Sequence, residues 1–159
     1  MASLLPVATT VFAMVLSIQP VHIPGYTAVT PAFTLMAVYH WTIYRPDLLP
    51  AFAVFIIGTL QDLLIGGPLG VTALLLLLAY ATILIHRRHF ANRSFPFVWA
   101  GFTLLSCVAM LFLWALHSLL AAAILDCRGA VFRGVLTVAA FPVASFLLGR
   151  TQRALMGAG

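Results

Sequence analysis

One carboxylate lies inside an apolar stretch of this 159-residue chain and is the first candidate for chemistry. Asp62 follows a long run of aliphatic and aromatic residues, and the only other acids are Asp47 and Asp126. A charged side chain at the centre of a bilayer costs about 2.5 to 3.5 kcal/mol on insertion scales, so Asp62 should face protein and not lipid. Gly58 lies one turn earlier on the same helical face, where a second helix can approach closely and cover the carboxylate.

Asp62 has two interpretations, a proton or cation site and a structural carboxylate that caps the following turn at Gly66 and Gly67. A transport site usually gathers several converging polar groups, and the neighbouring Gln61 is predicted to point off the Asp62 face. Both points favour the structural role. Because Asp62 and Arg133 are each expected about one turn below the outer membrane surface, they form a candidate intramembrane pair.

The histidines are weaker candidates. His117, next to Ser118, is expected to form a hydrogen bond between helices, and a role as a proton relay is disfavoured. His86 and His89 have nearly the spacing of metal ligands, but the arginines beside them disfavour a further cation. We therefore predict no metal and no cofactor, and we interpret this segment as a cytoplasmic basic loop that contacts anionic lipid headgroups. The arginines of that loop are Arg87, Arg88 and Arg93.

Enzymatic signatures are absent from the sequence. It holds no His-Glu-x-x-His, no Gly-x-Ser-x-Gly, no phosphate-binding Gly-x-x-x-x-Gly-Lys and no Cys-x-x-Cys. An intramembrane serine hydrolase would have to combine Ser106 or Ser145 with His117, and nothing in the flanking residues supports that arrangement. We therefore predict that the protein is not an enzyme.

The composition shows which elements must position these residues. Hydrophobic residues make up 64% of the chain and charged residues 7%, whereas soluble domains carry about 25% charged residues. The arginines lie in short gaps between apolar runs, so they indicate membrane topology and no nucleic acid is expected as a partner. The predicted fold class is an all-α polytopic integral membrane protein with a single transmembrane domain over residues 1–159. Its six predicted transmembrane helices are residues 4–18, 27–44, 48–65, 69–85, 97–125 and 131–149.

Three local features are predicted within these spans. The segment from Gly66 to Gly70 should form a tight reversal, which makes the third and fourth spans a hairpin. Pro142 should break the sixth span. The end of the second span is interpreted as an interfacial aromatic belt, and its residues are Tyr39, His40, Trp41 and Tyr44.

The distribution of arginine predicts the orientation. With six spans, both termini lie on one side together with six of the arginines, and Arg128 and Arg133 lie on the other side. Basic residues favour the cytoplasmic side, so both termini are predicted to be cytoplasmic and Cys127 is predicted to be outside.

An ordered motif gives the chain a family resemblance. A span that contains Pro31 is followed by Gly-x-x-x-Asp and then by Gly-x-Pro-Leu-Gly, and this order is similar to the signature of the rod shape-determining protein MreD family. The strong part of the resemblance covers about residues 30–82, one third of the chain. The residues that carry it are Gly58, Asp62, Gly66, Gly67, Pro68, Leu69 and Gly70.

The resemblance implies a non-catalytic inner-membrane subunit of the bacterial elongasome, which maintains cell shape and builds lateral peptidoglycan. It implies direct binding to MreC, a single-span protein with a periplasmic domain. It also implies a part in organising the glycosyltransferase RodA with its class B penicillin-binding transpeptidase, and an indirect link to the actin-like MreB. The implied fold is a bundle similar to the S-components of vitamin transporters. We hypothesise that the hairpin from Gly58 to Gly70 meets MreC.

Two other membrane functions remain as alternatives. An S-component-like subunit of a vitamin or small-molecule transporter needs polar and aromatic groups that converge on an outward cavity. The residues that could line such a cavity are Tyr26, Gln61, Asp62, Trp114 and His117. A proton-coupled exporter needs an acid that is reachable from both sides, and Asp62 lies too near one edge for that role.

Overall fold

The computed structural model describes residues 4–19, 31–124 and 126–157, without the side chains of residues 155–156. This part of the chain is all-helical and contains no strand. Its elements, in chain order, are α1 (Leu4–Ile18), α2 (Phe33–Tyr44), the short 3-10 helix η1 (Pro46–Leu48), α3 (Ala51–Ile65), α4 (Val71–Phe90), α5 (Phe95–Leu120) and α6 (Arg128–Met156).

The helices differ in whether they are long enough to cross a bilayer. By length and apolar composition three candidates are found among the described residues: α4, α5 and most of α6. Helices α1 and α3 have 15 residues and α2 has 12. At 1.5 Å per residue, helices of these lengths are about 22 and 18 Å long, which is less than the roughly 30 Å hydrocarbon core.

Several predicted boundaries differ from the observed ones. The second span was predicted to begin at residue 27, but α2 begins at Phe33. Pro31 and Ala32 are not helical, and residues 27–30 lie outside the described part of the chain. The third span was predicted to begin at residue 48, but α3 begins at Ala51, after η1 and Pro50. Helix α5 ends at Leu120, since residues 121–123 form a turn in which Ala122 has a φ of 50°. The end predicted at residue 125 was therefore about five residues too late.

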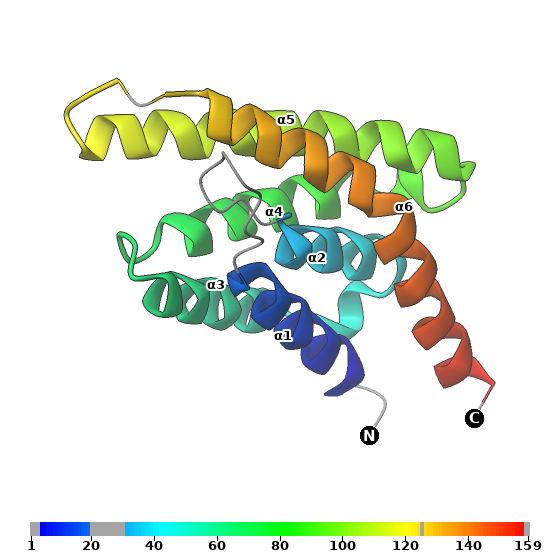
Figure 1. The fold of residues 1–159 in the computed structure, drawn as a ribbon. Coiled ribbons are helices and arrows are strands. Elements are labelled where there is room, and N and C mark those ends of the chain that lie inside the picture. The colour runs from blue at the N-terminus through cyan, green and yellow to red at the C-terminus, as the bar shows by residue number, and fades with distance from the viewer. Residues whose placement is uncertain (1–3, 20–30, 125, 158–159) are drawn as a thin grey trace.

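The elements are arranged in three layers (Figure 1). Helix α5 and the first part of α6 run together along one side, α2 and α4 lie in the middle, and α1 and α3 cover the opposite side. The start of α1, the connections from α2 to α3 and from α4 to α5, and the end of α6 all lie toward the right of the view. The turn from α3 to α4, the end of α5 and the start of α6 lie toward the left.

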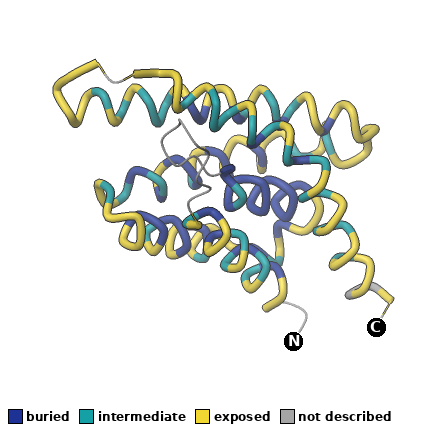
Figure 2. The backbone as a smooth tube through the Cα atoms, in the orientation of Figure 1, coloured by how far each residue is buried: buried dark blue, intermediate teal, exposed yellow. Residues whose placement is uncertain are grey.

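Helix α2 is the buried centre of the bundle, as the dark blue segment of Figure 2 shows. The hydroxyl of Tyr39 donates to the Val98 carbonyl at 2.9 Å, and Trp41 Nε1 donates to Thr9 Oγ1 at 2.9 Å. The interfacial belt was therefore a wrong prediction for Tyr39, His40 and Trp41, which are all buried. The polar tips of Tyr39 and Trp41 find partners on other helices, which allows large aromatic residues to pack in the core.

Helix α6 continues through Pro142 and bends beyond it (Figure 1), so the predicted break is wrong. Proline has no backbone N–H, and Val138, four residues earlier, therefore loses its helical donor. Trp99 Nε1 on α5 supplies a donor instead, at 3.2 Å from the Val138 carbonyl. The hydrogen bond from the neighbouring helix offsets the loss and allows the helix to bend without ending.

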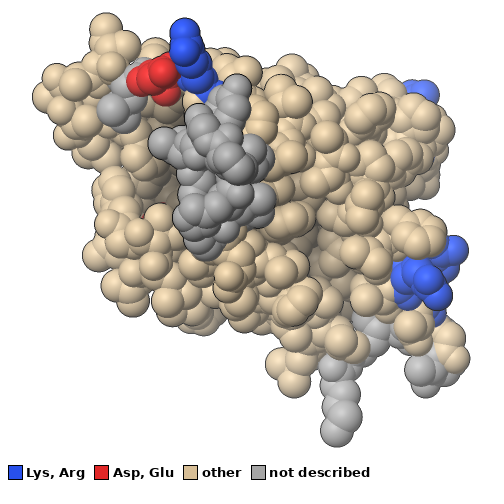
Figure 3. Space-filling view, viewed as in Figure 1, with Lys and Arg blue, Asp and Glu red and all other residues tan. Residues whose placement is uncertain are grey.

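The surface carries broad areas without charge. Figure 3 shows charged groups only toward the ends of the visible face. Large apolar residues are exposed on each of the three long helices, including Leu78 on α4, Leu104 and Leu111 on α5, and Phe146 on α6. Such surface would be unfavourable in water, and it agrees with a helical membrane protein.

Candidate functional site at the glycine hairpin

The turn between α3 and α4 depends on two glycines in the left-handed conformation. Gly66 ends α3 with a φ of +72°, and Gly70 precedes α4 with a φ of +93°. The amides of Gly66 and Gly67 both donate to the Asp62 carbonyl, at 3.1 and 3.3 Å. These two hydrogen bonds to one carbonyl end α3, and the chain reverses there, as the sequence predicts.

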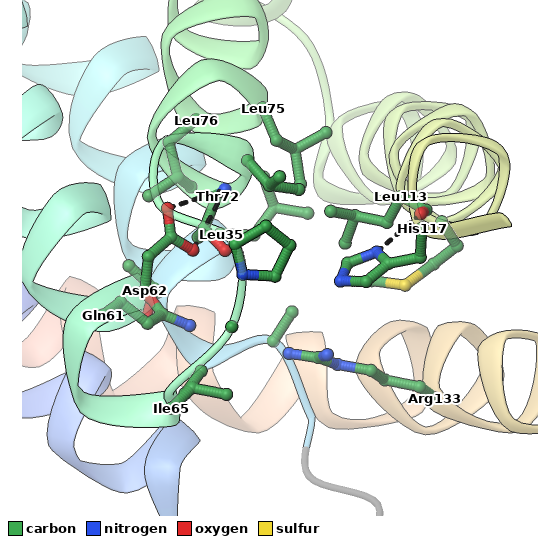
Figure 4. A pocket seen from close by; sticks show the side chains of 16 residues that line it. Leu35, Gln61, Asp62, Ile65, Thr72, Leu75, Leu76, Leu113, His117 and Arg133 are labelled. Carbon is green, nitrogen blue, oxygen red and sulfur yellow. Dashed lines mark hydrogen bonds between the residues drawn. The ribbon is translucent and has the colours of Figure 1, made fainter. Parts of the chain in front are cut away.

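The carboxylate of Asp62 caps the following helix. It accepts hydrogen bonds from the amides of Gly70 at 2.9 Å, Thr72 at 3.1 Å and Ala73 at 3.4 Å. Gly70 offers no side chain for this purpose, so the cap comes from α3, eight residues earlier. Figure 4 shows the bonds between Asp62 and Thr72. The negative charge also faces the positive end of the α4 dipole.

This geometry refines the structural interpretation of Asp62. The side chain was predicted to cap Gly66 and Gly67, but those amides are bonded to the backbone carbonyl of Asp62. The side chain bonds the start of α4 instead, because the reversal brings the free amides of that helix back over α3. Asp62 therefore stabilises the end of α3 through its backbone carbonyl and the start of α4 through its carboxylate.

The close approach predicted at Gly58 is present. A Cβ atom added at Gly58 would lie 2.5 Å from Ala73 Cα and 2.9 Å from Ala73 N. Both are backbone atoms, which a side-chain rotation cannot move away. The missing side chain thus brings Ala73 close enough for its amide to reach Asp62.

A polar cavity of about 90 Å³ lies beside the hairpin (Figure 4). Residues from α2, α3, α4, α5 and α6 line it. Its polar lining residues are Thr34, Gln61, Asp62, Thr72, His117 and Arg133. Gln61 was predicted to point off the Asp62 face, yet both side chains border the cavity. Neighbouring helix residues diverge by about 100°, which is small enough for both to reach one space.

The cavity brings Asp62 and Arg133 together without a direct contact. The structure gives no ion pair between them, and the Asp62 carboxylate is already bonded to the amides of α4. Arg133 points toward the cavity in Figure 4, and its Nε has no hydrogen-bond partner among the described residues. Gln61 Oε1 is likewise buried without one there. His117 Nδ1 bonds Leu113 O on its own helix at 2.7 Å, so this nitrogen does not form the predicted bond between helices.

The basic loop lies at the end of α4, away from the hairpin. Arg87 and Arg88 are in the last turn of that helix, where positive charge is favourable, and Arg93 lies 5.3 Å from the ring centre of Phe97. Among the described residues, no group of three His, Cys, Asp or Glu side chains could hold a metal ion. The Ser106 hydroxyl is buried and makes no bond to His117.

The two hairpin glycines provide a matched pair of substitutions. We expect Gly66→Ala to lower the free energy of unfolding by about 1 to 2 kcal/mol, because alanine is strained at positive φ. Gly67 has no positive φ, and an added Cβ would meet nothing within 4 Å. Gly67→Ala should therefore leave stability nearly unchanged. Thermal unfolding of both purified variants tests this, and equal losses would contradict the assigned conformations.

Sequence reasoning did not find two contributors to this site. Thr72 donates its amide to Asp62, and Thr34 lines the cavity from α2. The position of Thr72 was a usable signal, because the amides of the first helical turn need acceptors and Thr72 follows Gly70 by two residues. Thr34 gives no such signal, since only the packing of α2 in the core brings it there.

Comparisons with known proteins identify the family. Searches of curated proteins and of solved structures each gave no match. The family model described as rod shape-determining protein MreD matches residues 1–148, which is nearly the whole chain and includes all of the hairpin. The chain therefore belongs to the MreD family of rod shape-determining proteins.

Proposed function

We propose that this protein is a non-catalytic adaptor of the bacterial elongasome in the inner membrane. It binds MreC directly and helps to organise RodA and the class B penicillin-binding transpeptidase, with MreB as an indirect partner. Family membership supports a role in determining rod shape. The observation that carries the adaptor proposal is the hairpin, in which one buried carboxylate and one close glycine contact hold two helices in a fixed relation.

The hairpin presents apolar side chains from this rigid frame. Leu69 is 67% exposed, and Leu63, Leu64 and Ile65 are also exposed at the end of α3. A backbone that is already fixed in its bound conformation lowers the entropic cost of association. We propose that these four residues, the hairpin tip, contact the membrane span of MreC or the segment next to it.

We further propose that all six helices cross the membrane in an S-component-like bundle, with both termini cytoplasmic. The alternation of helix ends in Figure 1 supports this, because the start of α1, the end of α6 and the basic loop lie on the same side. Six of the eight arginines belong to that side. The shorter helices would then cross together with their flanking residues or in a locally thinner bilayer.

Cys127 tests this topology. We expect a membrane-impermeant thiol reagent to label Cys127 in intact spheroplasts, because this exposed residue precedes α6 on the proposed outer side. Cys107 is the internal control, since it lies in the middle of α5 and should not react from water. Labelling of Cys127 only after the membrane is broken would reverse the orientation.

The adaptor proposal is tested by recovery of MreC. We expect Leu69→Asn, at the hairpin tip, to reduce co-purification of MreC with a C-terminally tagged copy from gently solubilised membranes. Leu120→Asn is the matched control, because Leu120 is similarly exposed at the end of α5, near the same side. Both proteins should accumulate to normal levels. Full recovery of MreC with Leu69→Asn and with Asp62→Ala would contradict docking at the hairpin.

The polar cavity favours one second candidate, an S-component-like subunit of a small-molecule transporter. The cavity is bordered by five helices, and its unsatisfied Gln61 Oε1 and Arg133 Nε offer one acceptor and one donor. Its volume of about 90 Å³ is below the roughly 300 Å³ of a typical ligand pocket. The same purification separates the two functions, because a transporter subunit would bring paired ATPases and no MreC.

A further inference from the structure

An apolar groove runs between α1 and α6, and α2 also contributes to its wall. The groove has a volume of about 720 Å³ and is separate from the polar cavity at the hairpin. Both α1 and α6 pack on α2. The residues that form the groove include Phe12, Leu16, Met36, Ala140, Ala144 and Leu148.

The bend in α6 shapes this groove. Pro142 lies between the lining residues Ala140 and Val143, and beyond it α6 changes direction toward its C-terminus (Figure 1). The Trp99 indole donates to the Val138 carbonyl, which Pro142 leaves without its helical donor. Pro142 and the Trp99 contact therefore both lie where α6 changes direction beside the groove.

The walls of the groove need no polar partner. Thr9 Oγ1 donates to the Leu5 carbonyl at 2.9 Å and accepts from Trp41 at 2.9 Å. Thr151 Oγ1 donates to the Leu148 carbonyl at 2.7 Å. These hydroxyls are satisfied within the protein, and the other side chains along the groove before its basic end are apolar. A hydrocarbon chain suits such a surface, because it brings no polar group that would need a partner.

One end of the groove is basic. Arg150 lines both the groove and a neighbouring hollow of about 380 Å³, which Arg153 also lines. Arg153 Nε donates to the Gly149 carbonyl at 3.3 Å, one turn back. The acids Asp47, Asp62 and Asp126 are the only ones in the chain, and none is ion-paired with either arginine in the described structure. Two arginines about one turn apart on the same helix suit a phosphate group.

We propose that the groove binds an anionic phospholipid, with one acyl chain between α1 and α6 and the phosphate at Arg150 and Arg153. The groove has apolar walls whose hydroxyls are already hydrogen-bonded, and it ends at arginines without an ion pair. These features match a molecule with a hydrocarbon chain and an anionic head. This charge complementarity favours a lipid over the apolar helix of a partner protein. The site does not include the hairpin, so the lipid proposal does not depend on MreC docking there.

Native mass spectrometry of the purified full-length protein tests the proposal. The probes are phosphatidylglycerol and phosphatidylcholine with identical acyl chains. Wild type should retain phosphatidylglycerol preferentially, and Arg150→Gln combined with Arg153→Gln should weaken its retention by about tenfold or more, because both guanidinium groups that bond the phosphate in the proposed site are lost. Arg45→Gln combined with Arg128→Gln is the control, because it removes equal charge from two arginines that line neither the groove nor the neighbouring hollow, and it should change retention less than about twofold.

The groove itself is tested by Ala144→Phe, and by Ala144→Leu if the larger side chain prevents folding. Either variant should reduce retention of phosphatidylglycerol although all arginines remain. Equal loss in the two double arginine variants would overturn the proposal, because it would indicate general attraction of surrounding lipid. Unchanged lipid retention in the Ala144 variants would also overturn it. If those variants retained lipid but lost MreC, the groove would bind the partner protein and not a lipid.

Discussion

Asp62→Ala is expected to lower the free energy of unfolding by about 3 kcal/mol or more. The carboxylate accepts hydrogen bonds from Gly70, Thr72 and Ala73 and is 4% exposed. Each bond to a charged group contributes about 1.5 to 3 kcal/mol, and an amide left without a partner adds its desolvation penalty. Loss of a helix cap alone costs about 1 kcal/mol. The effect should appear as a lower midpoint when purified protein is unfolded with increasing SDS in mixed micelles.

Asp62→Asn separates the charge from the hydrogen bonds. Asparagine keeps one carbonyl acceptor of similar size, so we expect it to retain about half of the stability lost in Asp62→Ala. A proton or cation site would behave differently, because asparagine would abolish function while stability stayed near wild type. If both variants unfold within about 0.5 kcal/mol of wild type, the capping role is contradicted.

Gly58→Ala is the second change with a large expected effect. The added Cβ would lie 2.5 Å from Ala73 Cα, so α3 and α4 must separate. Overpacking of this kind costs about 1 to 3 kcal/mol, and we expect the upper end because the atoms that clash belong to the backbone. Separation also lengthens the bond from Ala73 N to Asp62, already 3.4 Å long. The same unfolding titration in SDS measures the loss.

Two further variants control for this result. Gly134 is also inside a helix, but an added Cβ there meets only the Met110 side chain, at 3.4 Å. Gly134→Ala should be neutral or slightly stabilising, because alanine favours the helix by about 0.5 to 1 kcal/mol. Adding Ala73→Gly to Gly58→Ala should not restore stability, since Ala73 Cα and N remain in place. Restoration would show that the Ala73 side chain, and not its backbone, limits the approach.

The hairpin could be predicted from the sequence because its determinants are local. Gly66 and Gly70 mark the reversal, and a lone acid in an apolar span must be covered and bonded. The structure confirms the turn. The cap on α4 was harder to predict from the sequence, because it depends on the direction in which the chain returns after the turn. Thr72 could have indicated it, as the first amides of a helix lack partners.

The core could not be predicted in the same way. Trp41 near a helix end is typical of a membrane interface, but it packs in the core because Thr9, 32 residues earlier, accepts from its indole. The boundary next to Gly66 was predicted correctly, at Ile65, but the sixth span was predicted to end at residue 149 and α6 continues to Met156. The end of α5 at Leu120 lies next to no Gly or Pro, and the sequence there continues to be apolar. Long-range packing decides these features, and composition carries little information about it.

The burial of α2 has a consequence for the order in which the protein is assembled. At 12 residues this helix is short, and it carries buried threonines and His40, so it gains little from insertion into lipid by itself. Its coverage is completed only by the last helix, where Phe141 packs on Tyr39 and Thr137 Oγ1 accepts from the amide of Ala32. A nascent chain that stops before α6 therefore leaves an incompletely covered second helix. We expect such chains to be recognised as incomplete and degraded by membrane proteases, whereas full-length chains persist.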